Sequence, residues 1–150
     1  MRVYTFIFIL CGIFFYFTNA YTKDIQQSHI NANLPETFEE FKKILGRDLK
    51  SYFSRIYNVS ITIDYELLRL APTQSGIAYP KFYAWITISE ADITVDAGAI
   101  RIVAIEKTRI EVTDFISQKK IRKKPKLIEL VFPNSLCDDI KKRAEVSKPD

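Results

Sequence analysis

The 150-residue chain contains one histidine and two cysteines, and both shortages exclude whole classes of chemistry. His29 is the only imidazole, so a histidine-dependent catalytic triad or a multi-histidine metal centre cannot be assembled from one chain. Cys11 lies in an apolar N-terminal segment, which leaves Cys137 as the only thiol of the remaining chain. A single thiol forms no intramolecular disulfide, so this is not a small disulfide-rich scaffold. We expect neither a metal site nor a cofactor.

Cys137 has two interpretations. A thiolate near a helix N-terminus is a potential nucleophile, but Asp138 and Asp139 follow Cys137 directly and disfavour ionisation of the thiol. We therefore predict that Cys137 is buried and packs as a small hydrophobic side chain. An intermolecular disulfide in an oxidising compartment is the alternative.

The N-terminus has the three parts of a secretory signal peptide. Arg2 supplies a positive charge, residues 3–17 are almost unbroken apolar sequence, and Ala20 is a small residue suited to cleavage. We predict a signal peptide over residues 1–20 and an exported protein, periplasmic or secreted. The alternative is a membrane anchor formed by residues 3–17. Residues 21–33 are polar and unpatterned, which predicts a flexible lead-in.

Positive charge is concentrated in the last quarter of the chain. Residues 21–116 carry 11 basic and 13 acidic side chains, whereas residues 117–150 carry 10 basic and 5 acidic ones. The basic character therefore belongs to the C-terminal part and not to the chain as a whole.

Residues 34–145 are predicted to form a single α+β domain, followed by a tail at 146–150. Apolar side chains recur every three or four residues between Phe38 and Ile56, which predicts an amphipathic helix over about residues 36–56. Leu34-Pro35-Glu36 is typical of a helix entrance, and Thr37 with Glu40 has the spacing of a capping box as an alternative start. Asn58 marks the end of the helix. Alternation from Val59 onward predicts a first strand.

Residues 81–116 predict three consecutive antiparallel strands, because successive side chains alternate between apolar sets on two faces. A turn is expected at 90–92, a bend at 96–98 and a tight reversal at 106–108. Gly98 predicts a bulge or a close backbone approach. One predicted face carries Phe82, Ala84, Ile86, Ile88, Ile100, Ile102 and Ala104, and the other carries Tyr83, Trp85, Val103 and Ile105.

Pro133 opens a predicted final helix that carries Leu136, Cys137, Ile140 and Ala144. The complete order is a long helix, a meander of about four antiparallel strands and short C-terminal helices. By element order only, this resembles the cystatin-like and NTF2-like cone folds. Because a fold does not fix a function, the resemblance carries no activity.

Carboxylates offer the only route to acid–base catalysis. By alternation Asp114 shares a face with Ile110 and Val112, so it is predicted to point inward. Inside a cupped sheet, Asp114 beside Tyr83 would form a proton-transfer pair in which burial raises the pKa of the acid. A capping or turn role for Asp114 is the interpretation we favour.

The basic run at 119–126 has two functional interpretations, a contact with acidic lipid head groups or one with nucleic acid. The run lacks interleaved aromatic residues, which disfavours nucleic acid. A solvated mobile linker is favoured over either. The candidate binding residues in this run are Lys119, Lys120, Arg122, Lys123 and Lys124.

The sheet face of Tyr83 and Trp85 needs a cover. The C-terminal segments are expected to supply it, and a partner protein or a small apolar ligand is the alternative. We thus predict an exported, non-enzymatic accessory or binding protein that uses the sheet face, the basic segment or both. The alternatives are a small NTF2-like pocket enzyme and a membrane-anchored subunit of an envelope assembly. Asn58-Val59-Ser60 also matches the N-glycosylation sequon.

Overall fold

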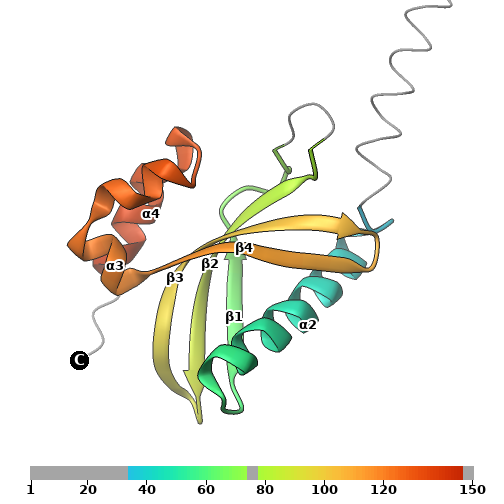
Figure 1. Cartoon of the computed structure of the whole chain (residues 1–150), viewed down its shortest axis with the longest axis horizontal. Helices are drawn as coiled ribbons and strands as arrows, with labels where there is room; N and C mark the ends of the chain where they lie inside the picture. The colour runs from blue at the N-terminus through green and yellow to red at the C-terminus, as the bar shows by residue number, and fades with distance from the viewer. Residues whose placement is uncertain (1–33, 74–77, 147–150) are drawn as a thin grey trace, which may run out of the picture. The chain divides into compact units, whose positions relative to one another are not determined.

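The computed structural model of the chain describes residues 34–73 and 78–146 (Figure 1). The predicted signal peptide, the lead-in at 21–33 and the last four residues lie outside these ranges, so export and anchoring remain predictions. Within the two described ranges, no helix combines the length and the apolar character needed to cross a membrane.

Helix α2 spans Phe38–Tyr57 and begins with the predicted capping box. The Glu40 amide donates to Thr37 Oγ1 over 3.1 Å, and the Thr37 amide donates to Glu40 Oε2 over 3.3 Å. These two bonds satisfy amides that have no acceptor within the helix. Asn58 ends the helix in the left-handed conformation with φ 54°, which confirms the predicted exit.

Four antiparallel strands follow in the order β1-β2-β3-β4, which confirms the predicted meander. They span Thr62–Leu67 (β1), Lys81–Glu90 (β2), Ile93–Glu106 (β3) and Arg109–Ser117 (β4). The turn between β2 and β3 places Ala91 and Asp92 at positive φ, 46° and 67°. Residues 96–98, where a bend is expected, lie within β3, and Val95 directly before them is the extra residue of a β-bulge.

Gly98 makes the close backbone approach predicted for it. A Cβ built on Gly98 would meet the carbonyl oxygen of Ile116 and would lie 2.8 Å from Phe115 Cε2 and 2.9 Å from Ser117 Cα. Gly98 pairs with Ser117, the last residue of β4. Glycine therefore lets β3 approach the C-terminal end of β4.

A bulge in β4 overturns one prediction. Arg101 pairs with Asp114 and Ile102 pairs with Val112, so Thr113 is the extra residue between the two pairs. The extra residue reverses the alternation, and Phe115 rather than Asp114 packs on the core beneath α2. The prediction that Asp114 shares a face with Ile110 and Val112 is therefore wrong.

Helix α2 covers one face of the sheet (Figure 1). Phe53 meets Phe115 edge to face with ring centroids 5.1 Å apart, and Phe41 lies 4.5 Å from Phe82. Each fully buried Leu, Ile or Phe contributes about 1.5–3 kcal/mol, so this core is a major source of the stability of the domain. The buried members of this core are Phe41, Leu45, Leu49, Phe53, Ile61, Phe82, Ala84, Ile86, Ile88, Ile100, Ile102, Ala104 and Ile110.

The C-terminal segments cover the opposite face, as expected. They are α3 (Gln118–Lys123), the 3-10 helix η1 (Pro125–Leu130) and α4 (Asn134–Val146). The expectation of a mobile linker over 119–126 is wrong, because most of this run is helical and Ile121 within it is buried. The buried members of this second core are Tyr83, Trp85, Ala97, Ala99, Ile116, Ile121, Ile128, Phe132, Leu136, Cys137, Ile140 and Ala144.

Candidate functional site

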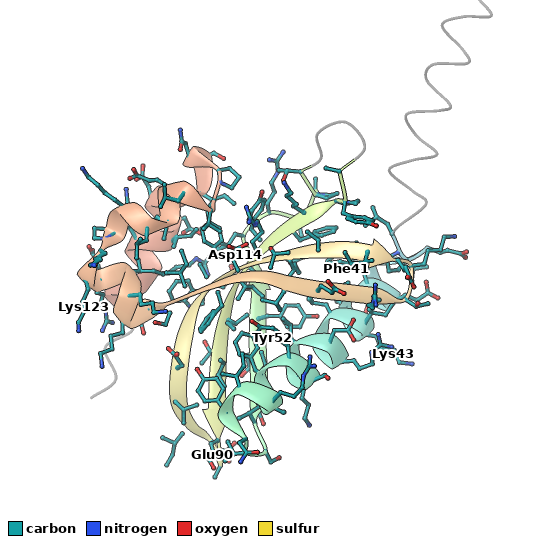
Figure 2. All side chains as sticks on the ribbon, in the orientation of Figure 1. Phe41, Lys43, Tyr52, Glu90, Asp114 and Lys123 are labelled. Atoms are coloured by element: carbon teal, nitrogen blue, oxygen red, sulfur yellow. The ribbon has the colours of Figure 1, made fainter. Side chains whose placement is uncertain are left out.

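Arg101 lies between Asp114 and Tyr83, the two residues of the candidate proton-transfer pair. Arg101 is the register partner of both residues, so the three side chains form a row across β2, β3 and β4. The guanidinium Nε and Nη2 of Arg101 lie 2.7 and 2.6 Å from Asp114 Oδ2. Asp114, labelled near the centre of Figure 2, is thus held by a cation and not by a tyrosine.

Tyr83 and Trp85 lie beneath the C-terminal helices. Their exposed fractions are 4% and 7%, and the Tyr83 ring lies 5.9 Å from that of Phe132. The Tyr83 hydroxyl shares a 2.9 Å hydrogen bond with Thr73 Oγ1. Both rings are therefore covered by the C-terminal segments of the chain.

The thiol of Cys137 is buried, as predicted. It lies 3.5 Å from the carbonyl oxygen of Pro133, and burial is the main cause that raises its pKa. Asp138 adds a smaller contribution in the same direction. Cys137 is therefore a packing residue and is poorly placed as a nucleophile or for a bridge to another chain.

Side-chain contacts fix the C-terminal helices to each other and to the sheet. Gln118 Nε2 and Arg122 Nε both donate to the carbonyl oxygen of Ala144, over 2.9 and 2.5 Å. Arg101 Nη1 donates to the carbonyl oxygen of Val131 over 3.3 Å. Ser117 caps α3 by accepting from the Lys120 amide over 3.4 Å. The basic run is therefore held on a defined platform.

Five exposed lysines occupy the outside of this platform. Within residues 34–73 and 78–146 none of them takes part in an ion pair, whereas Lys141 and Arg143 of α4 pair with carboxylates. Figure 2 shows Lys123 at the outer side of the C-terminal helices, away from the sheet. We name Lys119, Lys120, Lys123, Lys124 and Lys126 the five-lysine surface.

An apolar side chain borders the five-lysine surface. Leu130 is 81% exposed, and it lines an open depression of about 640 Å³ with Leu127, Lys124 and Lys126. The sequence analysis did not identify Leu130 as a candidate binding residue. A 3-10 period puts Leu130 out of phase with the buried Ile128, but it does not by itself predict exposure, because Leu127 on the same face is partly buried.

A second depression is lined by residues of α3, β2 and β3. It measures about 580 Å³, and Lys119, Arg122 and Lys123 line it together with Thr87 and Asp96. The Asp96 carboxylate already accepts from the Tyr57 hydroxyl over 2.9 Å and from the Ala97 amide over 2.8 Å. Lysines of the five-lysine surface thus line both depressions.

Comparison of the chain with protein-family models, with curated proteins and with solved structures finds no match. The functional argument therefore rests on the residues themselves.

Proposed function

We propose that this protein is an exported, non-enzymatic accessory protein that binds an anionic partner through the five-lysine surface. The observation that carries the proposal is a set of five exposed lysines, without ion pairs among the described residues, on a helical platform tied to the sheet. Each lysine brought near an anionic surface contributes on the order of 1 kcal/mol. A few such contacts are enough for salt-sensitive binding.

The contacts of the other candidates favour binding over catalysis. The Asp114 carboxylate is held by Arg101 over 2.6 Å, so it is not placed beside Tyr83 for a proton transfer. The face of the sheet under α2 is filled by Phe41, Leu45 and Phe53, each at most 4% exposed. The sheet face of Tyr83 and Trp85 is occupied by the chain itself, which leaves the basic segment as the binding surface.

Elution from heparin–agarose at about pH 7 tests the surface, because a clustered cationic site binds a polyanion more tightly than dispersed charges. The test variant replaces Lys120, Lys123 and Lys124 by Gln. The matched control replaces Lys43, Lys50 and Lys142, also exposed and without ion pairs in the described ranges, so both variants lose the same net charge. We expect the test variant to elute at clearly lower salt than the control. Equal elution of the two variants contradicts the proposal.

Export is tested separately by N-terminal sequencing of the protein recovered from cells. We expect the recovered chain to begin at Tyr21. Recovery of an intact Met1 contradicts cleavage after Ala20 and favours the anchored alternative.

A further inference from the structure

We propose that the anionic partner is a lipid bilayer, and that Leu130 inserts among the lipids while the five-lysine surface contacts their head groups. This inference rests on the proposed function and adds the identity of the partner. It starts from Leu130, which at 81% has the largest exposed fraction of the large hydrophobic side chains in the described ranges.

The geometry of η1 directs Leu130 outward. In a 3-10 helix residues three apart share a face, so Leu127 and Leu130 stack on one side. Ile128, on another side, is fully buried against the sheet and holds the helix in place. Leu127 is partly buried in the same core, whereas Leu130 at the end of η1 is exposed.

The charges around this tip match a lipid surface. Lys124 and Lys126 line the same depression as Leu127 and Leu130, and Lys120 and Lys123 precede them on α3. The acidic side chain of this lining, Glu129, is paired with Lys141 over 3.3 Å. An aliphatic side chain flanked by lysines is typical of segments that lie in the interface of an anionic membrane. The long lysine side chains reach the phosphates while the leucine enters the acyl region.

A nucleic acid fits the surface less well. Single strands are bound through aromatic side chains on which the bases stack. The aromatic residue nearest in sequence to Leu130 is Phe132, which is 4% exposed and packed against Tyr83. The exposed side chain is that of Leu130, which is aliphatic, and its transfer from water to a hydrocarbon environment is favourable.

A tryptophan reporter tests insertion in the full-length chain, because it senses its own surroundings however the N-terminus attaches. The chain has a single tryptophan, Trp85, which is buried and provides a constant background. The test variant is Leu130→Trp. The control is Leu70→Trp, at a residue that is 74% exposed on the loop after β1. Each is mixed with phosphatidylcholine vesicles, with and without about one third phosphatidylglycerol.

We expect the emission of the Leu130→Trp protein to shift to shorter wavelength with the anionic vesicles only, and to be quenched by brominated acyl chains. The shift should be lost when Lys120, Lys123 and Lys124 are also replaced by Gln. No shift at position 130, in a protein whose heparin elution still depends on these lysines, overturns the bilayer and leaves the proposed function intact. Equal shifts at positions 130 and 70 indicate adsorption without a preferred face and also overturn the inference.

Discussion

Arg143 of α4 and Glu66 of β1 form a bidentate ion pair between residues 77 positions apart. The Nη1–Oε2 distance is 2.7 Å and the Nη2–Oε1 distance is 2.9 Å. Arg143 Nε also donates to Asp139 Oδ2 over 2.9 Å, which orients the guanidinium. Two parallel bonds of this kind fix a direction as well as a distance. The pair therefore helps to set the position of α4, and with it the platform under the five-lysine surface.

Replacement of Glu66 by Gln should make the free energy of unfolding less dependent on pH in the acidic range. The Arg143 guanidinium lowers the pKa of Glu66 below its usual 4.5. A lowered folded-state pKa stabilises the protein above the unfolded-state value, and this contribution is lost as the pH falls through the folded-state pKa. Urea unfolding should show the variant less stable than the original protein at about pH 7, and this difference should shrink as the pH falls below 4.5. A difference that persists unchanged at low pH contradicts this role of the ion pair.

Substitution of two glycines by alanine should have opposite effects. Gly98→Ala places a Cβ against the backbone of β4 and should cost about 1–3 kcal/mol by overpacking. A Cβ at Gly46 meets only Tyr65 Cε1, at 4.0 Å, in the middle of α2. Gly46→Ala should therefore stabilise the domain by about 0.5–1 kcal/mol through helix propensity. Urea unfolding of both variants measures whether each substitution raises or lowers the free energy of unfolding. Destabilisation by both substitutions contradicts the argument.

The parts of the fold that follow local rules were predictable from the sequence. Alternation along β2 assigned Phe82 and Tyr83 to opposite cores, because strand side chains alternate without exception where no bulge occurs. The Thr37–Glu40 capping box, the alternative of the two predicted starts, is the one that begins α2. The spacing of apolar residues in the last helix identified its buried side chains, which are Leu136, Cys137, Ile140 and Ala144.

The remaining features depend on tertiary contacts. No glycine or proline marks the bulge at Thr113, so alternation placed Asp114 on the wrong face. Helix α3 has a single buried apolar residue, Ile121, and therefore no amphipathic stripe. Its helical form depends on the Ser117 cap and on bonds from its side chains to Ala144, 26 residues from Gln118. The basic composition of the candidate binding surface was thus predictable from the sequence, whereas the helical form of the segment that carries it was not.

Cys137 should react slowly in the folded protein. Burial raises the pKa of the thiol, and the thiolate is the species that reacts with disulfide reagents. In a Cys11→Ser protein, modification by an aromatic disulfide near pH 8 should be at least about tenfold slower in buffer than in urea. Equal rates in the two solvents contradict the buried position and make the intermolecular disulfide the better interpretation.

The Arg101–Asp114 pair should contribute to stability as a coupled unit. Their side chains are 28% and 26% exposed, so removal of one leaves a charge that is only partly hydrated. We expect Arg101→Gln and Asp114→Asn each to cost about 1–2 kcal/mol, with a coupling energy near 1 kcal/mol in a double-mutant cycle.

The pair of Arg109 and Glu106 provides the control for this cycle. Its atoms are 3.8 Å apart and its side chains are 53% and 63% exposed, so its coupling should stay below about 0.5 kcal/mol. Urea unfolding of the four single and two double variants measures both couplings under the same conditions. A coupling for Arg101 and Asp114 no larger than that of the exposed pair would mean that the guanidinium does not hold the carboxylate. Asp114 would then return as a candidate acid, and the preference for binding over catalysis would lose its main support.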